Sequence, residues 1–133
     1  MKLPLISIVD DDDMVRAATE GLIQSLGFET RTFSSAESFM ESSSLSESAC
    51  LILDVQLPKM SGIELQEQLH RLGLDIPIIF ITAYPDETAE TRALDAGAVG
   101  YLYKHDLFRF EQRLVDCLKA ALDRSEGRSS DGA

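Results

Sequence analysis

The chain has 133 residues, of which 44% are apolar and 26% are charged, and this is enough for one domain around a single core. Its 23 acidic and 12 basic residues give a formal net charge of -11, which opposes binding of the chain itself to nucleic acid or to an anionic membrane. No apolar run approaches the roughly 18 residues of a membrane-spanning helix, so we expect a cytoplasmic protein.

The first 33 residues predict a strand, a turn, a helix and a second strand. The β-branched run 5–9 is followed by four consecutive aspartates, Asp10–Asp13, and from Val15 onward the apolar residues have helical spacing. Gly27 lies where a left-handed helix cap is expected. The alternating segment 28–33 fits a strand at the edge of a sheet.

The middle of the chain contains a second helix, a third strand and a third helix. A capping-box signature at 34–37 predicts the start of a short helix, and the serine-rich segment 42–48 is expected to be a loop. The apolar run from Leu51 ends in a single carboxylate, Asp54, and suits a strand that is buried on both faces. A second capping box, at 61–64, begins the third helix.

Two further strands follow, and each ends at a polar residue. The apolar run 77–81 stops at Thr82, and an alanine-rich fourth helix then ends at Gly97. The fifth strand, 99–103, stops at Lys104.

The last helix has its apolar residues at helical spacing from Leu107 onward. We expect the domain to cover residues 4–124 and residues 125–133 to be a flexible tail or the start of a linker. Five strands that alternate with helices predict an α/β fold, a doubly wound parallel sheet covered on both faces.

The carboxyl ends of parallel strands meet at one edge of a sheet, where open α/β folds carry their sites. At this edge we expect Asp10, Asp11, Asp54, Thr82 and Lys104. Three carboxylates repel each other, and Mg²⁺ relieves that repulsion while keeping room for phosphate oxygens. The sequence therefore predicts phosphoryl transfer, in which Asp54 becomes an aspartyl phosphate while Lys104, Thr82 and the metal contact the other phosphoryl oxygens.

On these residues the chain resembles the receiver domains of two-component response regulators, and its spacings are most similar to those of receivers that precede LuxR-type output domains. The resemblance covers about residues 4–124. It implies the flavodoxin-like receiver fold with strand order 2-1-3-4-5 and phosphorylation of Asp54 by a histidine kinase. The matching residues are Asp10-Asp11, Asp54 with Pro58 and Ser61-Gly62, Thr82-Ala83, and Lys104.

The resemblance also implies a ligand set for Mg²⁺. Asp11, Asp54 and the backbone carbonyl of Gln56 would bind the ion directly, and Asp10 would act through water. The domain would be a phosphoacceptor switch with autocatalytic phosphorylation and dephosphorylation but without substrate turnover.

The switch implied by the family uses Thr82, which moves toward the phosphoryl group, and Tyr101, which turns inward. The face made by the fourth helix, the fifth strand and the last helix then changes, and a partner or a second copy docks there. Gln56 and Tyr84 match two positions whose side chains tune how fast water reaches the acyl phosphate, and a bulky Tyr84 is expected to shield it.

The sequence departs from the family at His105, where a proline in a cis peptide normally follows the lysine. A cis bond before another residue costs about 3–4 kcal/mol, so we expect a trans bond and a less firmly aimed Lys104. A protonated imidazole at this position could help to hold the phosphoryl group.

Several functions remain open at this point. The chain could be a stand-alone phospho-relay receiver or the input half of a transcription factor. In a haloacid-dehalogenase-like phosphatase, Asp10 and Asp12 would be nucleophile and acid, but Met14 stands where Thr or Val is expected. A flavin-binding module is disfavoured because Asp10–Asp13 would repel its phosphate. The cognate kinase, the output and the oligomeric state are not defined by the sequence.

Overall fold

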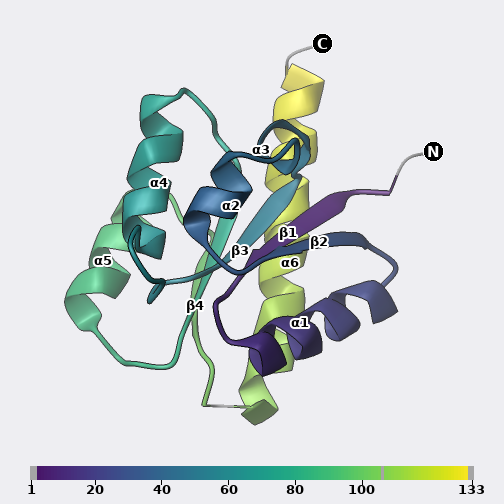
Figure 1. Cartoon of the computed structure of the whole chain (residues 1–133). Coiled ribbons are helices and arrows are strands. Elements are labelled where there is room, and N and C mark those ends of the chain that lie inside the picture. The colour runs from purple at the N-terminus through teal and green to yellow at the C-terminus, as the bar shows by residue number, and fades with distance from the viewer. Residues whose placement is uncertain (1–2, 106, 132–133) are drawn as a thin grey trace.

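Five parallel strands form one sheet at the centre of the computed structural model, which describes residues 3–105 and 107–131. The strand order is β2-β1-β3-β4-β5, and helices cover both faces of the sheet (Figure 1). This arrangement confirms the predicted fold class and strand order. The elements in chain order are β1 (Leu5–Val9), α1 (Asp13–Ser25), β2 (Glu29–Phe33), α2 (Ala36–Met40), α3 (Ser44–Glu47), β3 (Cys50–Asp54), α4 (Gly62–Arg71), β4 (Ile78–Thr82), α5 (Glu87–Asp95), β5 (Gly100–Tyr103) and α6 (Leu107–Asp131).

Two apolar clusters, one on each face of the sheet, hold these layers together. Helices α1 and α6 pack on one face, and α2, α4 and α5 pack on the other. Every residue of β1, β3 and β4 is buried, as expected for parallel strands that are covered on both sides. The side chains of the α1/α6 cluster include Ile6, Ile8, Ile23, Ile52, Ile79, Leu114 and Leu118, and those of the other cluster include Val9, Phe39, Leu53, Leu65, Leu69, Phe80 and Ala93.

The edge strand β2 was predicted from its alternating pattern, and none of its residues is fully buried. It pairs only with β1 in the described sheet. The turn that leads into it contains Gly27 with φ +92°, which confirms the predicted left-handed cap.

The serine-rich segment 42–48 is not entirely a loop, because it contains the one-turn helix α3. Four residues are too few for a helical periodicity to be recognised, so the sequence did not predict it. The predicted fourth and last helices are therefore α5 and α6 of the structure.

The predicted capping box at 34–37 is wrong, whereas the one at 61–64 is confirmed. Ser35 is the N-cap of α2 and its hydroxyl accepts from the Ser38 N–H. Glu37 does not close a box, since its carboxylate accepts a hydrogen bond from the Met60 N–H, 3.1 Å away. At α4 both reciprocal bonds of the capping box are present.

Helix α6 continues through residues 125–131, which the sequence predicted to be a tail or the start of a linker. Arg124 fastens this helix to the end of the sheet opposite the candidate site. Its guanidinium donates to the Gly97 carbonyl at 2.8 Å and to the Asp75 carboxylate at 3.1 Å. Within the described ranges, no helix combines the length and the apolar character needed to cross a membrane.

Candidate functional site

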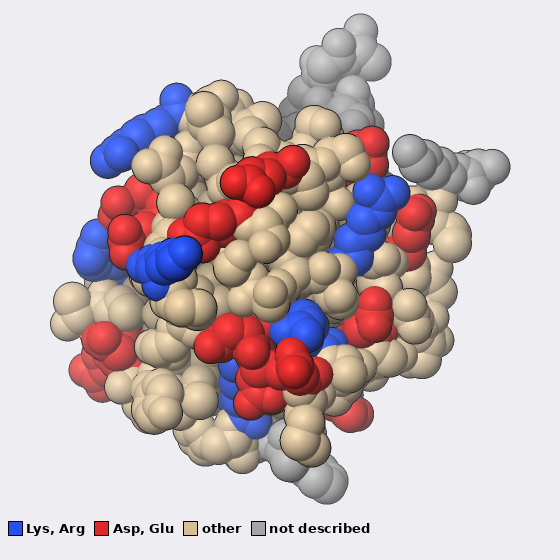
Figure 2. All heavy atoms as spheres, in the orientation of Figure 1, with Lys and Arg blue, Asp and Glu red and all other residues tan. Residues whose placement is uncertain are grey.

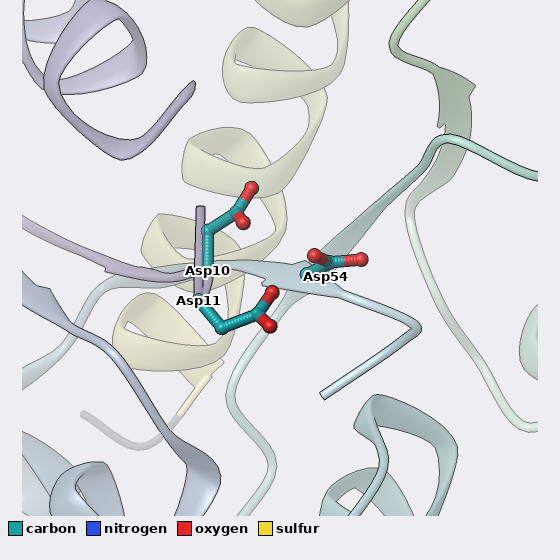
Figure 3. Close-up of side chains that lie close together, drawn as sticks. All are labelled: Asp10, Asp11 and Asp54. Atoms are coloured by element: carbon teal, nitrogen blue, oxygen red, sulfur yellow. The ribbon is translucent and has the colours of Figure 1, made fainter. Parts of the chain in front are cut away.

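The carboxyl edge of the sheet brings together the residues that were predicted to meet there. Asp10 and Asp11 follow β1, Asp54 ends β3, Thr82 ends β4 and Lys104 follows β5. Carboxylate oxygens of the three aspartates lie within 4.8 Å of one another (Figure 3). Asp10 and Asp54 are buried, whereas Asp11 is exposed, so the cluster has one side open to solvent.

Lys104 joins the two buried carboxylates. Its ammonium lies 2.8 Å from Asp10 Oδ2 and 2.9 Å from Asp54 Oδ2. The peptide bond from Lys104 to His105 is trans, as expected. The less firmly aimed lysine stays a prediction, and in this structure one ammonium pairs with both carboxylates.

The acidic turn after β1 is organised by local hydrogen bonds. Asp10 Oδ1 accepts from the Asp12 N–H at 2.9 Å, and Asp12 caps α1 by accepting from the N–H groups of Met14 and Val15. Arg16 donates from Nη1 to the Asp10 carbonyl at 2.8 Å. Figure 2 shows acidic side chains gathered near the start of α1, with basic side chains between them.

The electrostatics of the site follow from burial and from the ion pairs. Burial raises the pKa of the Asp54 carboxyl to about 6, because the Lys104 hydrogen bond offsets only part of this effect and Asp10 adds repulsion. Burial alone would lower the pKa of the Lys104 ammonium, but the carboxylates of Asp10 and Asp54 outweigh it and raise that pKa. At neutral pH the site therefore holds a charged lysine and a largely ionised Asp54.

Thr82 and Gln56 are in direct contact, which sequence reasoning did not anticipate. Thr82 is 0% exposed, and its hydroxyl donates to Gln56 Oε1 at 2.7 Å. The Gln56 backbone N–H in turn donates to Asp54 Oδ1 at 3.0 Å. Gln56 thus connects the end of β3 with the end of β4.

The loop between β3 and α4 is positioned by two features that the sequence alone did not reveal. A Cβ on Gly62 would lie 2.3 Å from the Asp54 carbonyl oxygen, so only glycine allows α4 to begin this close to β3. Glu37 holds the same loop through the Met60 N–H. The sequence did not reveal this role of Glu37, because the capping-box pattern predicted that its carboxylate would bond to the N-terminus of its own helix, α2.

The aromatic residues of β5 lie beside the site. Tyr101 is 2% exposed, and its hydroxyl has no hydrogen-bond partner among the described residues. Tyr103 donates its hydroxyl proton to Glu90 of α5, and the His105 ring lies 5.9 Å from the Tyr103 ring between centroids. Tyr84, predicted to shield the acyl phosphate, is 66% exposed.

The residues present fit a hard divalent cation. Asp10 Oδ2 is buried and accepts no hydrogen bond of good geometry from the described part of the chain, although the Lys104 ammonium pairs with it. A cluster of carboxylate oxygens that is open on one side is the kind of donor set that suits Mg²⁺, which keeps several of its waters.

A doubly wound parallel sheet with a buried aspartate, an acidic turn and a lysine at its carboxyl edge defines the receiver class of α/β domains. The chain belongs to the response regulator receiver domain family, whose sequence pattern it matches over residues 6–115. Receivers of this family are switches in two-component signalling, partner with histidine kinases and generally bind Mg²⁺ at an acidic pocket.

Individual relatives support this assignment. The response regulator protein TodT of Pseudomonas putida is 43% identical over 118 residues, which cover 89% of this chain and 51% of TodT. Nodulation protein W of Bradyrhizobium diazoefficiens is 40% identical over 124 residues, which cover 93% of this chain and 53% of that protein. A structure of the response regulator StyR superposes with a TM-score of 0.86 at 42% identity, covering 97% of this chain and 64% of StyR. The chain thus spans about half the length of these two curated relatives.

Proposed function

We propose that Asp54 accepts a phosphoryl group from the phosphohistidine of a histidine kinase. The observation that carries this proposal is the position of the Asp54 carboxylate, which is buried at the sheet edge and 2.9 Å from the Lys104 ammonium. A carboxylate without a functional role would be expected to face solvent, since burying a charge costs free energy.

The transfer needs positioning and cationic groups more than covalent chemistry. One Asp54 oxygen forms a bond to phosphorus, and the bond from phosphorus to the kinase imidazole nitrogen breaks, with its electron pair remaining on nitrogen. Lys104 neutralises charge that moves to the phosphoryl oxygens. The Thr82 hydroxyl then donates to another of these oxygens.

Mg²⁺ is the cofactor that these residues would hold. Asp11, Asp54 and the Gln56 carbonyl are the proposed direct ligands, and Asp10 is proposed to act through water. When bound, the ion supplies positive charge to the phosphoryl oxygens. Gln56 and Tyr84 are proposed to set how fast water hydrolyses the acyl phosphate.

The face made by α5, β5 and α6 is proposed as the surface that changes with phosphorylation. Tyr101 of β5 lies beneath it, and we propose that its ring responds to Thr82. This face has acidic residues on α5 and basic residues on α6, so a twofold pair of chains would place opposite charges together. The acidic residues are Glu87 and Glu90 of α5 with Asp86 at its N-cap, and the basic residues are Arg109 and Arg113 of α6.

Between the two receiver hypotheses, the length of the relatives favours the input half of a longer regulator over a stand-alone phospho-relay protein. We propose a cytoplasmic protein whose DNA-binding output domain follows the receiver. The haloacid-dehalogenase-like alternative is disfavoured, because the Asp12 carboxylate that would be its acid caps α1. We therefore propose a switch without substrate turnover.

The direct test is phosphorylation with a small acyl phosphate and Mg²⁺, followed by mass spectrometry. We expect wild-type protein to gain the mass of one phosphoryl group and Asp54→Asn to gain none. An equal gain in both proteins would exclude Asp54 as the acceptor. Turnover of a generic phosphate ester that depends on Asp10 would favour the phosphatase.

A further inference from the structure

The hydroxyl of Thr82 is already hydrogen-bonded within the domain. It lies 2.7 Å from Gln56 Oε1 and 3.1 Å from the Tyr84 carbonyl oxygen, so Gln56 is the nearer of two acceptors. Thr82 is completely buried, whereas Gln56 is exposed. A threonine hydroxyl carries a single proton and can therefore donate only one hydrogen bond at a time. Donation to Gln56 and donation to a phosphoryl oxygen on Asp54 exclude each other.

We propose that the Gln56 side chain is a positioning residue that holds Thr82 away from the phosphoryl group and thereby sets how readily the domain switches. This inference rests on the function proposed above, and it gives Gln56 a role in the switching equilibrium itself. The amide acts as an acceptor that competes with the phosphoryl oxygens for one proton.

The position of Gln56 suits this role. Its backbone N–H donates to Asp54 Oδ1 at 3.0 Å, so the residue is anchored to the reacting carboxylate, and its side chain reaches β4. Gln56 therefore contacts both the reacting carboxylate of Asp54 and the hydroxyl of Thr82.

Release of Thr82 also affects the following loop. The Thr82 hydroxyl oxygen accepts from the Tyr84 N–H at 3.1 Å, and two residues later Asp86 caps α5 by accepting from the Ala89 N–H. A rotation of Thr82 away from Gln56 changes the contact that orients this loop. The hold on Thr82 is thus connected to α5, which forms part of the proposed output face.

The test compares Gln56→Met with wild type in a titration with beryllofluoride, which mimics a phosphoryl group on aspartate, at saturating Mg²⁺. Methionine keeps the length of the side chain but removes the acceptor. We expect the affinity for beryllofluoride to rise roughly two- to tenfold, the range that a net neutral hydrogen bond permits. Gln24→Met is the matched control, because it removes another Gln–Thr hydrogen bond, to Thr30, away from the site.

A double-mutant cycle separates the hold on Thr82 from other effects of Gln56. In a Thr82→Ala background, Gln56→Met is expected to leave the affinity unchanged. An unchanged or weaker affinity in the single variant, or an equal gain in both backgrounds, would overturn the proposal.

A second readout does not require phosphoryl chemistry. Scalar couplings at the Thr82 methyl group report its χ1 rotamer in metal-free protein. We expect one rotamer in wild type and a measurably lower population of that rotamer in Gln56→Met, where only the Tyr84 backbone contacts still hold the hydroxyl. Identical couplings would refute the hold on Thr82, whereas failure of wild type to bind beryllofluoride would count against the proposed function and leave this readout intact.

Discussion

Asp54 combines two properties that oppose each other, a buried position and a negative charge. Burial, partly offset by Lys104 and reinforced by Asp10, raises the pKa of its carboxyl to about 6. The group thus changes its charge close to physiological pH, unlike an ordinary aspartate. Both its reactivity and its effect on stability become dependent on pH.

The first prediction concerns this titration. We expect the ¹³C shift of the Asp54 carboxyl in metal-free protein to titrate with a midpoint of about 6, because burial raises its pKa. Mg²⁺, which binds the ionised carboxylate, should move that midpoint to lower pH. A midpoint near 4 in the metal-free protein would contradict the role of burial.

The second prediction concerns stability. A raised pKa contributes stability that is fully present below the ordinary aspartate value of about 4 and is lost as the pH rises through about 6. Asp54→Asn should therefore raise the free energy of unfolding by roughly 1–3 kcal/mol at pH 7.5 in metal-free buffer, and by almost nothing at pH 4. Denaturant unfolding measures both values.

The exposed Asp123 on α6 offers the control for this substitution. Asp123→Asn should change stability little at either pH. If Asp54→Asn were destabilising at pH 7.5, the Lys104 ion pair would outweigh the cost of burying the charge.

The third prediction concerns Arg16, which holds the Asp10 carbonyl and thereby orients the peptide that leads to Asp11. Arg16→Gln should weaken Mg²⁺ binding several-fold, because a hydrogen bond to a charged donor is worth about 1.5–3 kcal/mol and its loss removes part of the orientation of this peptide. Calorimetric titration with Mg²⁺ measures the change. Arg31→Gln removes a cation that pairs with Glu47, and it should leave the affinity unchanged.

At the scale of single elements, the close approach of α4 to β3 depends on a missing side chain. An alanine Cβ at Gly62 would lie 2.3 Å from the Asp54 carbonyl oxygen, a backbone atom that cannot move without shifting the reacting residue. The start of α4 therefore determines how Asp54 is presented.

The fourth prediction follows from this contact. Gly62→Ala should destabilise the domain by about 1–3 kcal/mol through overpacking. Gly21→Ala is a matched control, because a Cβ there meets nothing within 4 Å in the middle of α1 and should stabilise by about 0.5–1 kcal/mol. Thermal and denaturant unfolding of the two variants should move in opposite directions.

For the whole molecule, we expect beryllofluoride and Mg²⁺ to promote pairing through the face of α5, β5 and α6. Because the proposed contacts join acidic residues of α5 to basic residues of α6, the dimer should weaken as salt is raised. Sedimentation at low and high ionic strength tests this fifth prediction. Pairing that strengthens with salt would indicate an apolar interface elsewhere.

The sequence predicted the five strands to within a residue or two, because continuous apolar runs ending in polar residues are typical of buried parallel strands. Their order was implied by the resemblance to receiver domains and not by the apolar pattern. The convergence of Asp10, Asp54 and Lys104 followed from the same rule. Contacts that depend on loop geometry could not be predicted. The bond from Thr82 to Gln56 spans 26 residues and the bond from Met60 to Glu37 spans 23, and no local pattern encodes either of them.

The hydrogen bonds of Arg124 fix α6 to the rest of the domain at a point far from the candidate site. The guanidinium donates to the carbonyl of Gly97, which lies just after the C-cap of α5. This hydrogen bond connects α5 and α6 at the end of the sheet opposite Asp54. A displacement of α5 would therefore be passed to α6 through this contact. Beyond Arg124 the helix continues to Asp131. A conformational change at the acidic edge would in this way be transmitted through α5 to the C-terminal helix α6.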